Sequence, residues 1–206
     1  VLPPVQRQLV RDAVPNDAGA DEIAVGCGRS GTFFAYEQAA ITPDFLCLSK
    51  GISGGYLPLS VVLTTDDLYS VFYADDTARG FLHSHSYTGN ALACRAALAT
   101  LTIFEEDGVL AANRSLAVRL SELMQPLMQH PQVRHARHLG MIWAFDVDST
   151  EPLFARRFYL AALARGLLLR PIGSTVYFMP PYIINEEECA FLVGGTLAAL
   201  NEVSAS

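Results

Sequence analysis

The sequence predicts an α/β fold followed by a smaller α+β unit. Up to residue 106, short apolar runs with the character of strands alternate with helical stretches, as in a sheet covered by helices. After residue 107 the order changes, and a helix leads into a series of short strands with helices among and after them. We therefore expect a boundary near residue 107 that separates residues 20–106 from residues 107–206.

The clearest strand of the first part is Phe45–Leu48. This apolar run lies between Pro43-Asp44 and Ser49-Lys50, and short apolar runs bounded by turn residues are typical of buried strands. Asn90 precedes an alanine- and leucine-rich stretch and is expected to be the N-cap of a helix. The other elements expected here are strands at 20–25 and 59–63, a glycine-rich loop at 51–55, helices at 66–73 and 90–106, and a long loop at 74–89.

Two end signals define helices in the second part. Gly166 follows the helical stretch 152–165, where a left-handed C-terminal cap favours glycine. Glutamates at 186–188 open the stretch 186–203, and acidic side chains in a first turn complement the helix dipole. The remaining expected elements are a helix at 108–129 and strands at 133–138, 141–147, 167–170 and 175–179.

Composition and charge argue against several classes of protein. The chain is 51% hydrophobic and 17% charged, within the globular range, and has no run of about eighteen uncharged apolar residues that would span a membrane. Its net charge of −7 and its lack of a basic patch argue against a nucleic-acid partner. Val1–Asp12 lacks the cationic start and apolar block of a signal peptide. The four cysteines are widely spaced and indicate neither a zinc site nor a disulfide framework, so we expect a reduced, cytoplasmic setting.

Lysine is nearly absent from the chain. Of the fourteen basic residues thirteen are arginine, and Lys50 is the only lysine. Arginine can supply charge and solubility, but its guanidinium stays protonated, whereas an amine can lose its proton and attack a carbonyl. Two explanations are open at this point: Lys50 is kept for its chemistry, or it is a chance survivor of codon bias.

The neighbours of Lys50 favour the chemical explanation. Lys50 ends a predicted strand and precedes the glycine-rich segment Gly51–Gly55, and ligands collect at the carboxyl ends of strands in open α/β sheets. Asp21-Glu22 ends an earlier predicted strand, where a carboxylate could pair with the pyridinium nitrogen of pyridoxal phosphate. Taken singly, the glycines could form a flexible turn, and the Asp-Glu pair could be an ordinary acidic loop.

Hydroxyl groups gather in the segment His83–Asn90, directly before a predicted helix. Hydroxyls and free backbone N–H groups at a helix start are suited to binding a phosphate. His83 and His85 also permit a metal interpretation. No carboxylate or cysteine joins them at ligand spacing, so we expect no metal site.

These segments together resemble the class III, pyridoxal-phosphate-dependent aminotransferases. Asp21–Gly31 reads DEIAVGCGRSG and is similar to the DE-x-x-x-G-x-GR-[ST]-G signature of that family. Pro43-Asp44 and then Leu48–Gly51 follow at the spacing of the family's lysine segment. The resemblance covers roughly residues 20–203.

Within the family, the chain looks most like the members that serve biotin synthesis. Ala24 stands where many relatives carry glutamine, and His83–Cys94 reads HSHSYTGNALAC. Leu169–Pro171 and Tyr177–Tyr182 are further points of similarity. The resemblance implies transfer of an amino group from S-adenosylmethionine to 8-amino-7-oxononanoate, giving 7,8-diaminononanoate.

The resemblance also implies a role for individual residues. Lys50 would form the Schiff base with the cofactor and carry the proton shift, and Asp21 would hold the pyridinium nitrogen. Ser86 falls where the family usually has a threonine that binds the cofactor phosphate across a dimer interface. Arg170 would pair with a substrate carboxylate, and Tyr177 would lie near the same pocket. A homodimer is therefore expected.

The implied fold is part of a fold type I pyridoxal-phosphate transferase. Residues 20–106 would be the C-terminal half of the large, cofactor-binding domain, with its mainly parallel sheet, and residues 107–206 the small α+β domain. Residues 1–19 do not match the family, whose members run to more than twice this length. We therefore expect this chain to be the C-terminal portion of such an enzyme. Its residues 20–206 would adopt the family fold only in part, or only when further polypeptide completes it. The alternatives are a class III ω-aminotransferase with another amine donor, and an inactive truncated remnant.

Overall fold

The computed structural model describes residues 18–149 and 151–204, so most of the segment 1–19 lies outside the described residues. The chain divides into two compact units, residues 1–109 and residues 110–206. Each unit is described by itself below. The assignment of residues 20–106 and 107–206 to a large and a small domain stays a prediction.

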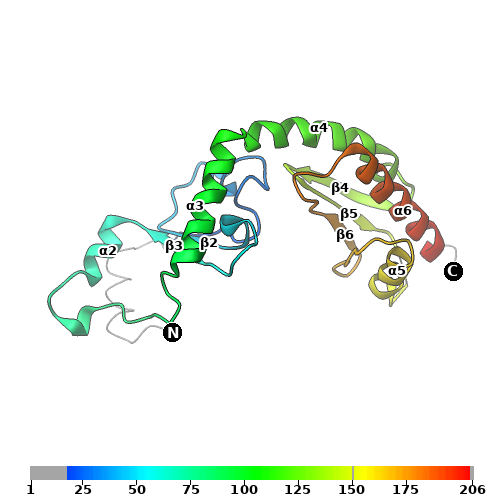
Figure 1. Ribbon diagram of the computed structural model, residues 1–206. Coiled ribbons are helices and arrows are strands. Elements are labelled where there is room, and N and C mark those ends of the chain that lie inside the picture. The colour runs from blue at the N-terminus through cyan, green and yellow to red at the C-terminus, as the bar shows by residue number, and fades with distance from the viewer. Residues whose placement is uncertain (1–17, 150, 205–206) are drawn as a thin grey trace. The chain divides into compact units, whose positions relative to one another are not determined.

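A three-stranded sheet organises the first unit (Figure 1). Strand β1 (Gly19–Asp21) pairs in parallel with β2 (Phe45–Leu48), and β2 pairs in antiparallel fashion with β3 (Val61–Thr64). The register sets Asp21 opposite Cys47, and the backbone N–H of Glu22 continues the pairing by donating to Cys47 O at 3.0 Å. The carboxyl ends of β1 and β2 therefore meet at the same edge of the sheet.

The helices of the first unit follow the sequence expectations closely. Asn90 Oδ1 accepts hydrogen bonds from the backbone N–H groups of Leu92 and Ala93 at 3.0 and 3.1 Å, which confirms Asn90 as the N-cap of α3. The α-helices are α2 (Asp66–Phe72) and α3 (Ala91–Glu106), and the 3-10 helices are η1 (Ala35–Ala39), η2 (Lys50–Ser53) and η3 (Thr77–Arg79).

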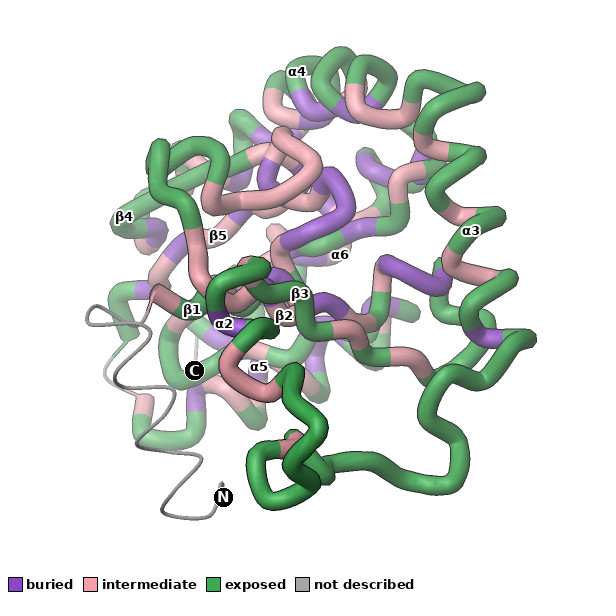
Figure 2. The backbone as a smooth tube through the Cα atoms, turned by 90° about the vertical axis from the view of Figure 1, so that its left-hand side faces the viewer, coloured by how far each residue is buried: buried purple, intermediate pink, exposed green. Residues whose placement is uncertain are grey.

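The core of the first unit is small. Among the described residues, its main hydrophobic cluster consists of the buried side chains Cys27, Leu46, Leu48 and Ile52, and Leu68 and Ala93 are buried outside this cluster. Helix α3 packs against this core. Its Phe104 ring stands edge-on to the ring of Phe33, with 5.3 Å between the ring centroids. Residues 81–90, ahead of α3, are exposed throughout (Figure 2).

The second unit joins an antiparallel sheet to three helices. Helix α4 (Val109–Met128) leads into β4 (Val133–Leu139), β5 (Ile142–Val147), α5 (Phe154–Leu163), β6 (Thr175–Phe178) and α6 (Glu186–Ser204), and the strands stand in the order β4-β5-β6. Along β5, Trp143, Phe145 and Val147 are buried while the residues between them are only half-buried. One face of the sheet therefore packs on the helices, as the alternation of a strand requires.

Several expected boundaries are wrong. The strand expected at 20–25 ends at Asp21, because residues 23–30 turn back on themselves in a series of tight turns. Residues 167–170 form no strand, although Leu167 and Leu169 are buried. Their apolar character reflects packing of an extended segment into the core and not sheet pairing. The glycine-rich loop begins as η2, and the strand expected at 59–63 is β3, two residues later at its start.

Asp146 joins the strands of the second unit on the half-buried face of the sheet. Its carboxylate accepts hydrogen bonds from Thr175 Oγ1 at 2.7 Å and from Arg137 at 3.2 Å, and it contacts His135 Nδ1 at 3.0 Å. The hydrogen bond from Thr175, followed by those from Arg137 and His135, lowers the pKa of Asp146 from 3.8 to about 2.

This lowered pKa predicts how the stability of the second unit depends on pH. A carboxyl group with a depressed folded-state pKa stabilises the fold above pH 3.8 and loses that contribution as the pH falls through about 2. The difference in unfolding free energy between the parent chain and Asp146→Asn should therefore shrink between these two values. Urea unfolding at a series of pH values measures it. The matched control is Asp148→Asn, whose carboxylate pairs with Arg134 at 3.2 Å; an equal pH effect in both variants would contradict the prediction.

Within the described ranges, no helix is long and apolar enough to cross a membrane.

Candidate active site

The parallel pairing of β1 and β2 brings the two central predicted residues to one sheet edge. Asp21 is the last residue of β1, and Lys50 follows β2 by two residues. Both side chains are exposed. A carboxylate and an amine thus lie beyond the carboxyl ends of neighbouring parallel strands, where ligands of α/β sheets collect.

Asp21 has one carboxylate oxygen engaged in the protein. Its Oδ1 accepts a hydrogen bond from the backbone N–H of Ile23 at 3.0 Å, which forms an Asx turn at the end of β1. Among residues 18–149 and 151–204, Oδ2 accepts no hydrogen bond. The turn fixes the direction of the carboxylate and leaves Oδ2 able to accept a hydrogen bond from a ligand.

Lys50 is held by its backbone while its side chain stays exposed. It begins η2 with a φ of 46°, in the left-handed region that residues other than glycine rarely adopt. Ser53 Oγ donates to Leu57 O at 2.7 Å, and Ser49 Oγ donates to Leu59 O at 2.7 Å. These bonds fix the loop on both sides of Lys50, which takes part in none of the ion pairs found among the described residues.

Glu22 organises the segment between β1 and β2. It is only 3% exposed, and its carboxylate accepts hydrogen bonds from the backbone N–H groups of Ala35 at 2.9 Å and Tyr36 at 2.8 Å. Its backbone oxygen accepts a bond from Gly26 N at 3.0 Å. The sequence named Glu22 only together with Asp21, as a pair from which one carboxylate could meet the cofactor, and predicted no separate role for it. A buried carboxylate that accepts hydrogen bonds from two backbone N–H groups has a structural role, because it holds the loop between β1 and β2 in place. We call this arrangement the Glu22 clamp; the position of Glu22 beside Asp21 in the sequence did not indicate it.

Cys27 lies directly against the residue that follows Lys50. A Cβ added to Gly51 would stand 2.9 Å from Cys27 Cβ, closer than real Cβ atoms approach, and 3.2 Å from its Sγ, which is also a tight contact. Burial, and next the charge of Glu22, raise the pKa of the Cys27 thiol, so that it stays neutral in its apolar surroundings. The sequence showed Cys27 as one of four scattered cysteines, and only the fold brings it to Lys50.

Ser86 lies in the exposed segment ahead of α3. The tight turn around it is closed by Thr88 N, which donates to His85 O at 3.0 Å, and by His85 N, which donates to Thr88 Oγ1 at 3.0 Å. No hydrogen bond joins Ser86 to Asp21 or Lys50 within the described residues. Its role as a ligand of the cofactor phosphate stays a prediction.

Arg170 and Tyr177 belong to the second unit. Arg170 is exposed in the extended segment before the bridge between Ile172 and Thr175, and Tyr177 lies on β6 opposite Ala144. Their roles stay predictions.

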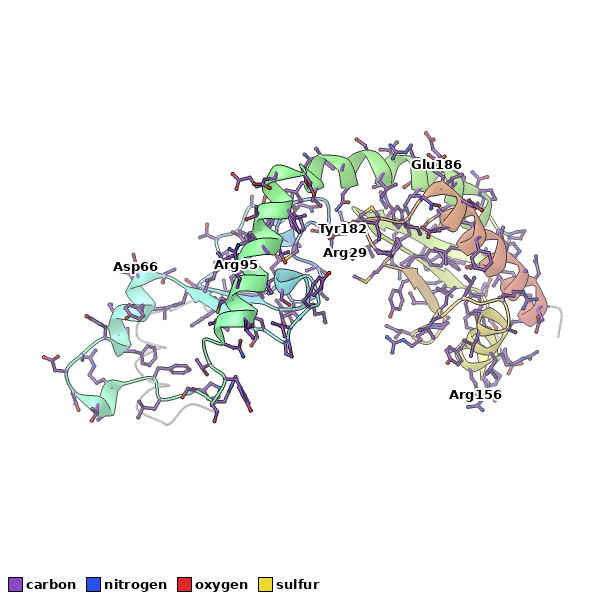
Figure 3. The ribbon with its side chains drawn as sticks, viewed as in Figure 1. Arg29, Asp66, Arg95, Arg156, Tyr182 and Glu186 are labelled. Atoms are coloured by element: carbon purple, nitrogen blue, oxygen red, sulfur yellow. The ribbon has the colours of Figure 1, made fainter. Side chains whose placement is uncertain are left out.

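A hollow of about 650 Å³ lies elsewhere in the second unit, between α4 and the segment that leads into α6. Figure 3 labels Tyr182 and Glu186 at its border. Glu186 forms an ion pair with Arg119 at 3.3 Å across this hollow. None of the predicted site residues lines it.

The comparison with known protein families decides the assignment. The model of the family described as aminotransferase class III matches residues 20–200. The chain belongs to the class III aminotransferases. This family depends on pyridoxal phosphate, as the resemblance of the sequence predicted.

Curated relatives give the match more detail. The chain is 51% identical over 189 residues to adenosylmethionine-8-amino-7-oxononanoate aminotransferase of Helicobacter pylori, covering 89% of this chain and 43% of that protein. It is 42% identical over 197 residues to the protein of the same name from Nitratidesulfovibrio vulgaris, covering 90% of this chain and 36% of that protein. The chain therefore spans less than half the length of the curated relatives it matches.

Solved structures confirm the fold class. The chain superimposes on adenosylmethionine-8-amino-7-oxononanoate aminotransferase of Methanocaldococcus jannaschii with a TM-score of 0.81 and 32% identity, covering 94% of this chain and 48% of that one. A thermostable omega transaminase of Pseudomonas jessenii matches with a TM-score of 0.84 and 26% identity, covering 95% and 46%. The mixed α/β architecture is thus that of pyridoxal-phosphate-dependent transaminases.

The residues at the sheet edge fit the chemistry of pyridoxal phosphate. Asp21 offers an unengaged carboxylate oxygen for a pyridinium N–H, and Lys50 offers an exposed amine for an aldehyde. The Asx turn of Asp21 and the fixed backbone of η2 hold both groups on rigid elements. Such support is what a cofactor site needs from its protein.

Proposed function

We propose that this chain is part of an aminotransferase that transfers an amino group from S-adenosylmethionine to 8-amino-7-oxononanoate, giving 7,8-diaminononanoate in biotin biosynthesis. The observation that carries the cofactor chemistry is the placement of Asp21 and Lys50 beyond the ends of two paired parallel strands. The 51% identity to the protein of that name in Helicobacter pylori supports the choice of substrates.

Asp21 and Lys50 would act directly at the reacting group. Bound pyridoxal phosphate supplies an electron sink that stabilises negative charge on the carbon bearing the transferred nitrogen. The Asp21 carboxylate would accept a hydrogen bond from the pyridinium N–H, which would keep that nitrogen protonated and positively charged. The Lys50 amine, in its neutral form, would take a proton from the substrate carbon and deliver it to the cofactor carbon on the other side of the transferred nitrogen, which arginine at this position could not do.

Ser86, Arg170 and Tyr177 would bind the rest of the cofactor and the substrate. The Ser86 hydroxyl would donate to the cofactor phosphate of a second subunit, and its place in an exposed segment is compatible with such a contact. This role requires a homodimer. Arg170 would pair with a substrate carboxylate through its planar guanidinium, with Tyr177 beside the same pocket.

The complete reaction would need further polypeptide. The chain spans about 43% of the Helicobacter pylori relative, so the wall of the pocket supplied by the rest of such a protein lies outside this sequence. Residues 20–206 would then complete their fold against that additional chain. We further propose a cytoplasmic location, where S-adenosylmethionine is available to the enzyme.

A cofactor titration tests the proposed site. Asp21→Asn keeps the Oδ1 acceptor of the Asx turn but removes the charge, so it should leave the melting temperature unchanged. The variant should bind pyridoxal phosphate about 10- to 100-fold more weakly, because a hydrogen bond to a charged group contributes roughly 1.5–3 kcal/mol. Absorbance at the cofactor band, followed during the titration, gives both affinities.

The matched control is Asp66→Asn, which removes one charge from an exposed first helical turn of the same unit. Its affinity should equal that of the parent chain. The proposed site is wrong if Asp21→Asn binds as tightly as the parent, or if the parent shows no saturable band.

The amine donor is tested separately. The chain, completed by the missing portion of a close relative, should release an amino group from S-adenosylmethionine to the cofactor faster than from an ω-amino acid or from lysine. Among the solved structures, the omega transaminase of Pseudomonas jessenii is 26% identical to this chain and the adenosylmethionine-8-amino-7-oxononanoate aminotransferase of Methanocaldococcus jannaschii is 32% identical, and this difference favours S-adenosylmethionine. Preference for an ω-amine would favour the alternative.

A further inference from the structure

Two residues with strained backbones meet at the candidate active site. Cys27 has a φ of 54° and Lys50 a φ of 46°, both in the left-handed region, which is unfavourable for residues that carry a Cβ. Strained residues persist only where the surroundings over-determine them. The structure therefore needs a contact that holds this pair of turns together.

The contact is between the Cys27 side chain and Gly51. The added-Cβ distances of 2.9 Å to Cys27 Cβ and 3.2 Å to Sγ show that Cys27 rests on the α-carbon of Gly51 with no space between them. Gly51 itself has no φ in the left-handed region. Its backbone would accept alanine, and Cys27 alone opposes a side chain there.

The position of Cys27 is fixed in turn by the Glu22 clamp. Glu22 O accepts from Gly26 N at 3.0 Å, and Gly28 N donates to Phe33 O at 3.2 Å, so the backbone is bonded on both sides of Cys27. The Glu22 carboxylate holds the return of this loop through Ala35 N and Tyr36 N. Glu22 is adjacent to Asp21. The segment that orients the Asp21 carboxylate therefore also carries Cys27, which packs beside Lys50.

We propose that Cys27 is a positioning residue for Lys50: by packing on Gly51 it sets the direction in which the Lys50 amine leaves the sheet edge, relative to Asp21. This inference rests on the proposed function, in which Lys50 condenses with the cofactor aldehyde. The thiol acts by its shape. Its raised pKa keeps it uncharged, and its burial keeps it out of contact with a ligand.

The test uses Lys50 as a built-in reporter, because it is the only lysine of the chain. The parent chain is incubated with pyridoxal phosphate and cyanoborohydride. The amine condenses with the aldehyde carbon with loss of water, and hydride from the reductant leaves a stable secondary amine, located by peptide mass mapping. Acylation of Lys50 by acetic anhydride, which needs no orientation, is measured in parallel.

A rescue experiment separates positioning from folding. Gly51→Ala should slow trapping of pyridoxal phosphate about tenfold and leave acylation unchanged, since a displacement of about 1 Å can cost up to ~100-fold in rate. Cys27→Gly is compatible with the positive φ at residue 27 but removes the side chain that packs on Gly51, and it should slow trapping less than Gly51→Ala does. The double variant Cys27→Gly/Gly51→Ala should recover to within about threefold of the parent, because contacting residues compensate each other. Gly19→Ala, with open space at its Cβ, is the control and should match the parent.

The outcomes distinguish this inference from the proposed function. If the folded parent traps pyridoxal phosphate no faster than the urea-unfolded parent, the proposed function fails and the inference falls with it. If the parent traps it rapidly and Gly51→Ala does so equally well, the inference alone is overturned. If Gly51→Ala unfolds, the double variant decides: recovered trapping supports the contact, and continued loss overturns it.

Discussion

Replacing Lys50 with arginine is expected to abolish covalent trapping of pyridoxal phosphate while the chain stays folded. Lys50 is exposed and forms no ion pair within the described residues, so Lys50→Arg keeps the positive charge and breaks no contact. Guanidinium stays protonated at neutral pH and cannot add to an aldehyde. The trapped product at residue 50 should disappear, and any transamination by the completed enzyme should fall by at least about 100- to 10,000-fold, the usual contribution of a general base.

Two measurements check this expectation. Mass mapping after reduction detects the adduct, and thermal unfolding confirms that the variant keeps the melting temperature of the parent. Arg29→Lys is an informative companion, because it introduces a second amine in the same unit. An adduct that forms equally at residue 29 would show that any amine of the chain reacts, and would contradict a special role for Lys50.

Truncation of Phe158 should cause the largest loss of stability in the second unit. Phe158 is fully buried on α5, and its ring lies 5.6 Å from that of Phe154 between centroids. Phe158→Ala leaves a cavity in the shared core of the sheet and helices and is expected to cost about 3–5 kcal/mol. Domains are stable by only about 5–15 kcal/mol, so this change removes a large part of the total.

Phe191 provides the control on the neighbouring helix. It is 58% exposed on α6, and Phe191→Ala should change the free energy of unfolding by less than about 1 kcal/mol. Urea unfolding followed by tryptophan fluorescence reports on this unit, because Trp143, the only tryptophan, is buried in its core. Equal losses in the two variants would contradict the core derived from the fold.

The elements with strong local signals could be predicted from the sequence. The strand at Phe45–Leu48 and the Asn90 cap have the predicted residues, because an apolar run between turn residues and a capping side chain are properties of a few neighbouring residues. Residues 167–170 were misjudged because buried leucines in an extended segment look like a strand, and only the partner strands decide whether pairing occurs.

The candidate site was predictable only in part. Asp21 and Lys50 were found because their spacing resembles a known signature, and the parallel register explains why that spacing works. Glu22 and Cys27 were missed because their partners, Ala35, Tyr36 and Gly51, are distant in sequence and contribute only backbone atoms. A backbone contact leaves no side-chain pattern to read.

The unequal cores of the two units have a consequence for local unfolding. Among the described residues, the hydrophobic cluster of the first unit holds four buried side chains, whereas that of the second is built from the large aromatic and aliphatic residues of its sheet and three helices. Regions with few buried apolar contacts open at lower free energy than the rest of a protein. Amide hydrogens around β1 and β2 should therefore exchange with solvent earlier than those of β5, and Lys50, for which we propose the catalytic role, belongs to the part of the chain that is expected to open first.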